Sequence, residues 1–386
     1  MKPLSIYVHV PFCAQKCAYC DFASWPNREG QWRRYFDAIA AEIRLWSENT
    51  DFGLLRSRFR VRSLFIGGGT PTLVPGEYIA EIVDECRRVA PFDDDAEITL
   101  EGNPGTLTPE KLRVYRDAGV NRLSLGAQSF DDGLLKSLGR IHTARQVAEA
   151  VETAREAGFS NVNLDLMYGL PGQTMAQWRH TLERAVALDV THISAYSLIV
   201  EEGTPMAARV SRGEAVLPGD EATIAMQRHA VAMLAKNGFG RYEISNYAKP
   251  KSECRHNLTY WRRGDYLGLG CAAHSMLDDC RFANPDSLDE YLQGARMTAF
   301  QRLDERDIIE ETVMLATRTA RGIDLRKWRE RFGGDFAPRN CRALGRLEDA
   351  GLIAVTGDRL WLTDRGMEVQ NAVILELLEI QEANER

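Results

Sequence analysis

The sequence predicts an α/β protein: a partial barrel of six β/α units, followed by a C-terminal α+β domain with a winged-helix-like segment. Over the first 250 residues, short runs rich in β-branched residues alternate with amphipathic helical stretches. Polar or glycine residues follow most of these runs, and beyond about residue 250 the pattern becomes irregular. We therefore divide the chain into residues 1–250 and residues 251–386.

Six strands and the helices between them account for the barrel prediction. The predicted strands are Ser5–Val10, Ser63–Ile66, Glu97–Leu100, Arg122–Leu125, Asn161–Met167 and His192–Ser197. The clearest predicted helices are Trp32–Trp46, Tyr78–Val89, Ala144–Ala157 and Met175–Leu188. A full barrel of this type has eight strands, so six units predict a partial one.

Residues suited to chemistry lie at or near the ends of these strands. They are Cys13, Gly67 to Thr70, Glu101, Asn103, Gln128, Asp165 and Tyr196 to Glu201. In β/α barrels the carboxyl ends of the strands meet at one rim, where active sites form. We therefore expect these residues to gather at a single rim.

The C-terminal part predicts a helix followed by two short strands joined by a turn at Thr356-Gly357-Asp358, the outline of a winged helix. Winged helices often bind DNA, but residues 305–386 hold more acidic than basic residues and the whole chain has a net charge of −7. Such a segment is a poor binder of phosphate. We expect no nucleic-acid partner and favour a packing or lid role.

Composition predicts a cytoplasmic protein. Hydrophobic residues make up 44% and charged residues 27% of the chain, close to the average for globular proteins, and neither a signal peptide nor a transmembrane stretch is expected. In a reducing compartment, clustered cysteines are more often metal ligands or catalytic groups than disulfides. The scattered cysteines, expected to be ordinary thiols, are Cys86, Cys254, Cys271, Cys280 and Cys341.

Three cysteines lie close together near the N-terminus: three residues separate Cys13 from Cys17, and two separate Cys17 from Cys20. A structural zinc site needs four ligands, whereas three thiolates can hold three irons of a [4Fe–4S] cluster and leave the fourth iron open. An open iron can bind the amino and carboxylate groups of S-adenosylmethionine. We also expect the aromatic rings of the loop and its flanks, Phe12, Tyr19 and Phe22, to shield the cluster from water.

These residues lie in a recognisable set of motifs. The segment CAQKCAYC resembles the signature of the radical S-adenosylmethionine superfamily. The flanking motifs YVHVPFC, GGGTPT, LEGNPGT, RLSLGAQSF, LGRIH and NLDLMYGLPGQT resemble the oxygen-independent coproporphyrinogen oxidase subfamily. Together they cover most of residues 5–200, and residues 251–386 fit the C-terminal domain of that subfamily.

The resemblance implies one or two S-adenosylmethionine molecules beside the cluster. The residues implied to bind them are Tyr7, Gly68, Gly69, Thr70, Glu101, Gln128, Arg140, Asp165 and Ile199. Tyr7 and Glu101 would contact the first molecule, and Gln128, Arg140 and Asp165 the second. The glycine–threonine backbone would pair with the methionyl amino group or approach the second molecule, and the isoleucine would lie against an adenine.

One position departs from the oxidases, which have a further cysteine two residues after the third. Here that position is Phe22, and the signature lies closer to the start of the chain than in the oxidases. Both differences place coproporphyrinogen oxidation in doubt. The motif HNLTYW, which begins at His256, instead resembles a branch of the subfamily described as haem chaperones.

This resemblance adds haem to the expected ligands. Imidazole is a common axial ligand of haem iron, so we expect His256 to bind haem, with His9 and His274 as alternatives. Tyr260 and Trp261 could stack on a porphyrin face. The implied partners are haem, recipient respiratory haemoproteins, membrane-bound acceptors in transient contact, and a second copy of the chain in a homodimer.

Two functions compete at this point. In the first, the protein carries haem, and the cluster and S-adenosylmethionine support transfer or dimerisation. In the second, it is an active radical enzyme, an oxidase-like or methyltransferase enzyme that acts on a tetrapyrrole or another substrate. A DNA-binding redox regulator is disfavoured by the acidic C-terminal part.

Overall fold

The computed structural model describes residues 1–48, 54–337 and 341–384. Its main body is a 12-stranded sheet whose central strands, β1 to β6, are parallel neighbours in chain order. These strands are β1 (Lys2–Val10), β2 (Phe59–Gly68), β3 (Phe92–Gly102), β4 (Arg122–Gln128), β5 (Asn161–Tyr168) and β6 (His192–Ser197). The prediction of an α/β fold with six parallel β/α strands is therefore confirmed.

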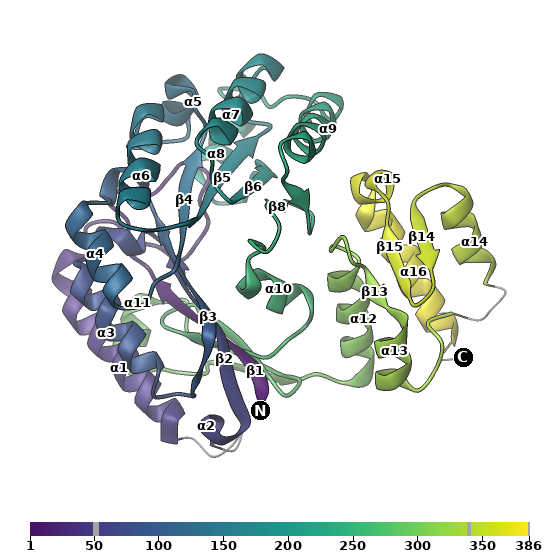
Figure 1. Cartoon of the computed structure of the whole chain (residues 1–386), viewed down its shortest axis with the longest axis horizontal. Coiled ribbons are helices and arrows are strands. Elements are labelled where there is room, and N and C mark those ends of the chain that lie inside the picture. Colours follow the sequence, from purple (N-terminus) through teal and green to yellow (C-terminus); the bar gives the residue numbers. More distant parts are fainter. Residues whose placement is uncertain (49–53, 338–340, 385–386) are drawn as a thin grey trace.

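Helices cover the outer side of this sheet (Figure 1). They include α1 (Trp32–Glu48), α3 (Gly76–Cys86), α4 (Pro109–Asp117), α6 (Ala144–Glu156), α7 (Met175–Ala187) and α9 (Asp220–Lys236). The short helix α2 (Leu55–Arg58) leads into β2, and α5 (Asp132–Ser137) and α8 (Pro205–Ser211) pack beside residues 18–19. Short 3-10 turns lie at Glu29–Gln31, Pro71–Leu73 and Pro104–Thr106. Helix α10 (Arg255–Trp261) lies on the opposite, inner side of the strands (Figure 1).

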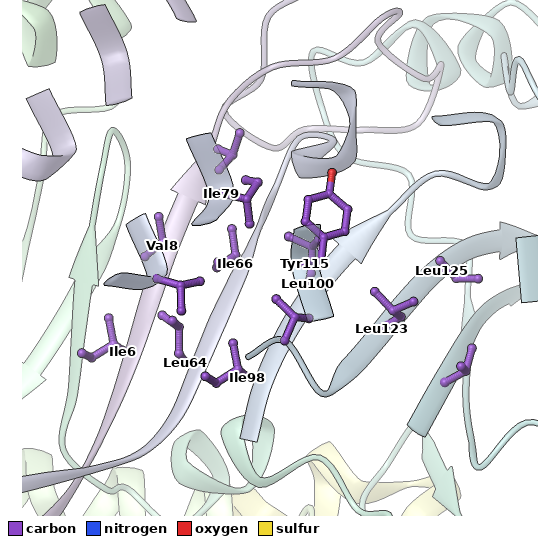
Figure 2. Close-up of a cluster of buried hydrophobic side chains, with 14 of the residues drawn as sticks. Ile6, Val8, Leu64, Ile66, Ile79, Ile98, Leu100, Tyr115, Leu123 and Leu125 are labelled. Atoms are coloured by element: carbon purple, nitrogen blue, oxygen red, sulfur yellow. The ribbon is translucent and has the colours of Figure 1, made fainter. Parts of the chain in front are cut away.

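The alternation of side chains along the strands separates a dry outer face from a polar inner face. In β1, Ile6 and Val8 are fully buried toward the helices, whereas Tyr7 faces inward. Figure 2 shows the same pattern across four strands, with aliphatic side chains packed beside Ile79 of α3 and Tyr115 of α4. Burial of these side chains holds the helices on the sheet, and the inner face is left for polar groups.

The sheet continues beyond the six predicted strands on both edges. Its additional strands are β7 (Gly240–Arg241), β8 (Asn246–Ala248), β9 (Tyr266–Leu269), β10 (His274–Leu277), β11 (Cys280–Ala283) and β12 (Ala299–Arg302). Strand β9 pairs in parallel with β1, and β10 to β12 follow as antiparallel neighbours. Helix α11 (Leu288–Leu292) lies between β11 and β12 in the chain. The division at residue 250 stays a prediction, and the sheet itself extends to residue 302.

A second hydrophobic core lies in the C-terminal part, around residues such as Val313, Trp328 and Leu360. Its elements are α12 (Glu305–Ala316), β13 (Ile323–Asp324), α13 (Leu325–Phe332), α14 (Arg342–Asp349), β14 (Ile353–Thr356), β15 (Arg359–Leu362), α15 (Asp364–Glu368) and α16 (Gln370–Asn384). The hairpin β14–β15 after α14 confirms the winged-helix-like outline. Gly357 adopts a φ of 58° at its tip.

The C-terminal part contacts the main body at both edges of the sheet. On one side the Arg228 guanidinium in α9 binds Glu368 at 2.7 and 2.8 Å, and the amide of Ala320 donates to the carbonyl of Tyr242 at 3.0 Å. On the other side Arg263 binds Glu311 of α12 at 2.9 Å. Within the described residues, no helix is long and apolar enough to cross a membrane.

Candidate functional site

The three clustered cysteines lie on a loop that continues from the carboxyl end of β1. The loop is held from two sides, because the amide of Ala18 donates to the carbonyl of Leu138 at 3.0 Å and the amide of Met206 donates to the carbonyl of Ala18 at 2.8 Å. Cys13, Cys17 and Cys20 are each partly exposed and free. The loop therefore presents three available thiols on a backbone anchored to the rim.

The surroundings of the thiols suit a cluster better than a single ion. In a cubane each thiolate binds a different iron, so three thiols on one loop suit the chemistry of a cluster. Burial raises the pKa of Cys13 and Cys20, and the nearby Cys17 raises both further. Arg140 lies 3.4 Å from the Cys17 sulfur and can balance thiolate charge. The donor set thus fits a [4Fe–4S] cluster.

The expected aromatic shield is only partly present. Phe12 is buried in the core beneath the loop, and Tyr19 is partly buried. The Phe22 side chain, by contrast, is 62% exposed. The expectation that Phe22 shields the cluster therefore stays a prediction.

The glycine run after β2 packs directly on the start of the cysteine loop. The amides of Gly69 and Thr70 donate to the carbonyls of Val10 and Phe12 at 2.8 and 2.7 Å. A Cβ on Gly69 would lie 2.7 Å from the Phe12 carbonyl oxygen, so no side chain fits there. This close approach places the half-buried glycine–threonine segment beside the cysteine loop, and its role toward S-adenosylmethionine stays a prediction.

Glu101 lies at the end of β3 and supports the same glycine run. One of its carboxylate oxygens accepts from the amide of Gly68 at 3.0 Å. Burial, and then the nearby Asp165, raises the pKa of Glu101 to about 7. The buried amide oxygen of Asn103 has no hydrogen-bond partner among the described residues. This part of the rim can therefore accept a proton-bearing ligand group.

Arg140 and Gln128 lie on the opposite side of the cysteine loop. The guanidinium of Arg140 donates to the carbonyl of Gly126 at 2.6 Å, and the buried Nε has no partner within the described chain. Gln128 has a φ of 63° after a register shift in β4, and its side-chain oxygen accepts from the Tyr196 hydroxyl at 2.9 Å. Ile199 follows β6 and is 67% exposed. Of these three residues, Arg140 contacts the cysteine loop directly, through the Cys17 sulfur.

The six parallel strands curve into an arc (Figure 1). A cavity of about 200 Å³ lies on its inner side, below the rim formed by the carboxyl ends of the strands. It is lined by Tyr7, Phe65, Glu101, Arg122, Ser124, Asn163, Asp165, Ser194, His256, Asn257 and Tyr260. Asp165 accepts from Asn163 at 2.8 Å and from Ser124 at 3.3 Å, and burial raises its pKa. Three predicted S-adenosylmethionine residues, Tyr7, Glu101 and Asp165, therefore meet in one cavity with the predicted haem ligand His256.

His256 is completely enclosed. Its side chain is 1% exposed, and its ring nitrogens make hydrogen bonds to the hydroxyls of Ser63 at 3.1 Å and Tyr260 at 2.8 Å. Burial, followed by the charge of Arg122, lowers its pKa to about 3. With both nitrogens occupied, this histidine can reach haem iron only if α10 moves.

The alternative histidines differ from each other. His9 is buried, donates from Nε2 to the carbonyl of Ala23 at 2.8 Å, and accepts from the hydroxyl of Tyr7 at 2.9 Å. His274 is exposed at the start of β10. Tyr260 is engaged with His256 and packs edge-on against Tyr266 with a ring separation of 4.8 Å. Of the three candidate iron ligands, His256, His9 and His274, only His274 is accessible from solvent.

Sequence reasoning missed several residues of the cavity, above all Arg122, Asn163 and Asn257. Arg122 and Asn163 occupy inward positions of β4 and β5, so strict alternation with the buried aliphatic residues could have identified them. Asn257 belongs to α10, whose position inside the arc has no signal in the local pattern.

Comparisons with known proteins agree with this geometry. The chain matches the radical SAM superfamily over residues 7–185 and the HemN C-terminal domain over residues 303–369. It is 35% identical to the heme chaperone HemW of Bacillus subtilis, over 96% of this chain and 97% of that protein. It is 38% identical to the heme chaperone HemW of Mycobacterium tuberculosis, over 98% and 95%. The structure of coproporphyrinogen III oxidase HemN from Escherichia coli, a radical SAM enzyme, superimposes with a TM-score of 0.82 at 25% identity, covering 97% of this chain and 90% of that one.

Proposed function

Because the chain belongs to the HemW family of haem chaperones within the radical SAM superfamily, we propose that it binds haem and transfers it to respiratory haemoproteins. In this proposal Cys13, Cys17 and Cys20 hold a [4Fe–4S] cluster. S-adenosylmethionine lies between the cysteine loop, the glycine run at Gly68 and the carboxyl of Glu101. The bound cluster would supply one electron to S-adenosylmethionine.

The protein's own residues have defined parts in that site. Gly68 to Thr70 would offer backbone to the ligand, Arg140 would balance thiolate charge at Cys17, and Glu101 would hold a proton or accept from an amino group. Gln128, Asp165 and Ile199 would complete a second S-adenosylmethionine site. Since the Tyr7 hydroxyl already bonds to His9, Tyr7 would act mainly through its ring.

The main observation in support of haem transfer is that side chains fill most of the space inside the arc of strands. Its cavity of about 200 Å³ is lined on one side by α10, whereas sites for ligands of drug size span roughly 300–1,000 Å³. A tetrapyrrole therefore does not fit inside this conformation. We place haem outside this cavity, with the exposed His274 of β10 as the first candidate for the iron ligand, and His256 only after displacement of α10.

The partners follow from this function. The protein would act in the cytoplasm, as a homodimer in its cluster-bound form, and would contact membrane-bound acceptors transiently during transfer. The Phe22 position and the 35–38% identity to haem chaperones support the carrier function over coproporphyrinogen oxidation.

Absorbance titration with haem tests the proposal. We expect the wild-type protein to bind haem stoichiometrically, His274→Ala to lose the axial-ligand spectrum, and His256→Ala to keep it. Loss in His256→Ala alone would assign the iron to α10 instead. Failure of the wild-type protein to bind haem would reject the carrier function.

A radical enzyme is the second candidate, favoured by Glu101 and Asp165, two carboxyls of raised pKa in one cavity. Anaerobic incubation with S-adenosylmethionine and a reductant measures 5′-deoxyadenosine release. Sustained release with a modified product and no haem binding would favour the enzyme. Coproporphyrinogen should remain unconverted, and robust formation of protoporphyrinogen would overturn the interpretation of Phe22.

A further inference from the structure

Arg122 is a buried cation that lacks hydrogen-bonding partners among the residues that the structure describes. It opens β4, its residue is 2% exposed, and its side chain lines the inner cavity. Its Nε has no hydrogen-bond partner, and none of the hydrogen bonds or ion pairs found within residues 1–48, 54–337 and 341–384 involves its guanidinium. A guanidinium carries five N–H donors in a planar fork, so this group has unused donors beside an open space.

The nearby carboxylates are already committed to other groups. Glu97 accepts from the backbone amides of Arg255 and His256 at 2.9 and 3.1 Å and so caps α10. Asp165 accepts from Asn163 and Ser124. Both carboxylates attract Arg122 through space, but neither accepts a hydrogen bond from it.

A second arginine shows what a structural buried cation looks like in this molecule. The Arg263 side chain is 5% exposed and binds two carboxylates, Glu311 at 2.9 Å and Asp279 at 2.5 Å. Burying a charge without such partners is destabilising, because the lost hydration is not replaced. The burial of Arg122 is therefore not offset by direct hydrogen bonds from any described residue.

We propose that the inner cavity binds the carboxylate group of a ligand, held by the Arg122 guanidinium. A carboxylate matches the fork of arginine with two parallel hydrogen bonds, and Phe65 and Tyr260 offer ring surface for adjoining methylene groups. Two sources have this chemistry: a propionate arm of a tetrapyrrole bound to His256 after displacement of α10, and the methionyl carboxylate of a second S-adenosylmethionine that is not on the cluster iron. The identity of the source rests on the proposed function; the carboxylate site itself does not.

Thermal unfolding of the cofactor-free protein tests the site with a simple probe, sodium propionate against sodium chloride at equal ionic strength. Propionate should raise the Tm of the wild-type protein and leave that of Arg122→Met unchanged. Without propionate, Arg122→Met should unfold at or above the wild-type temperature, because an unpaired charge is removed. The matched control Arg263→Met should unfold at a lower temperature, since it removes two buried ion pairs and leaves Asp279 with Arg331 and Glu311 with Arg281.

Two results would overturn the proposal. An equal response of wild type and Arg122→Met to propionate would show that the effect arises elsewhere. A fall in the Tm of propionate-free Arg122→Met as large as that of Arg263→Met would show that Arg122 has a structural role. Arg122→Lys, which keeps the charge and loses the fork, should retain only a weakened response to propionate.

Ligand analogues then distinguish the sources. Affinities are compared for haem and its dimethyl ester, and for S-adenosylmethionine and its decarboxylated form. The true source should bind about 10- to 100-fold more weakly without its carboxylate in the wild-type protein, with no such difference in Arg122→Met. Equal affinities within both pairs would overturn the site. A propionate response without binding of haem or S-adenosylmethionine would support the site and reject the proposed function.

Discussion

The six parallel strands carry polar residues in two places, at their rim and inside their arc, and these differ in how completely their hydrogen bonds are formed. At the rim, the cysteine thiols are partly exposed, and the Asn103 oxygen and the Arg140 Nε lack partners in the described structure. Inside, His256 and His192 use both ring nitrogens.

This difference separates residues that hold the protein together from residues that remain available to ligands. A buried polar group with all its hydrogen bonds formed contributes to a specific structure. A buried group with unused donors or acceptors is costly until a ligand arrives. By this criterion the rim is a binding region and most of the interior is structural, although Arg122 and the buried Thr99 hydroxyl lack hydrogen-bond partners among the described residues.

The largest expected effect is at the rim. Cys17→Ala should lose the [4Fe–4S] cluster completely after anaerobic reconstitution, because the remaining two thiolates cannot hold three irons. Iron content and visible absorbance measure this. The control Cys341→Ala, partly exposed in the C-terminal part, should keep the full cluster content. An intact cluster in Cys17→Ala would remove the cysteine loop from the binding region.

Glu101 lies at the end of β3 and also lines the inner cavity, so Glu101→Gln tests the boundary between the rim and the interior. The folded protein raises the pKa of this carboxyl from 4.5 to about 7, so the folded state binds its proton more tightly than the unfolded state. Wild-type stability should therefore fall as pH rises from about 4.5 to 7, by up to about 3 kcal/mol.

Glutamine removes this titration but can still accept from the amide of Gly68. Urea unfolding at pH 5 and pH 8 should therefore show Glu101→Gln gaining stability relative to wild type at the higher pH. Parallel stability curves for the two proteins would show that Glu101 ionises as freely in the folded protein as in the unfolded chain.

The interior is tested by His256→Ala. Removing the ring leaves the hydroxyls of Ser63 and Tyr260 without their partner and should lower the free energy of unfolding by about 2 kcal/mol. The exposed His274→Ala is the matched control and should change it by less than about 0.5 kcal/mol. Equal losses in the two variants would contradict the distinction between interior and rim.

The smallest effect is expected at Phe22. Because 62% of its surface is exposed, Phe22→Ser should change the free energy of unfolding by less than about 0.5 kcal/mol and leave the cluster content unaltered. Chemical denaturation and iron analysis measure both quantities. A loss above about 1 kcal/mol would mean that this ring packs against the loop after all.

The sequence was sufficient for the central strands, because their buried aliphatic residues alternate or run together in short segments. It was insufficient for β9 to β12, which are strands of four residues within a glycine-containing segment. Their pairing is decided by the free edge of β1 and not by local pattern. Helix α4, PEKLRVYRD, is not among the clearest predicted helices because it is short and mostly polar.

Prediction of the site from sequence has a similar limit. The cysteine spacing identifies the cluster ligands, because three thiols on one loop are sufficient to hold three irons of a cluster. The i, i+4 pair His256 and Tyr260 predicts a shared helix face, but the same pair fits a haem site and a packed interior equally well. Burial decides between them, and burial depends on α10 lying inside the arc. The unpaired state of Arg122 likewise depends on side chains contributed by β3, β5 and α10.

The position of β1 between β2 and β9 affects the order in which the protein can fold. This strand is synthesised first, and β2 follows soon after, but β9 begins only at Tyr266. Pairings between distant segments form slowly, since a long loop must close before they contribute. The strand that leads into the cysteine loop therefore keeps one open edge until most of the chain exists. Secure anchoring of the cysteines is consequently a late event in folding, although they lie near the beginning of the chain.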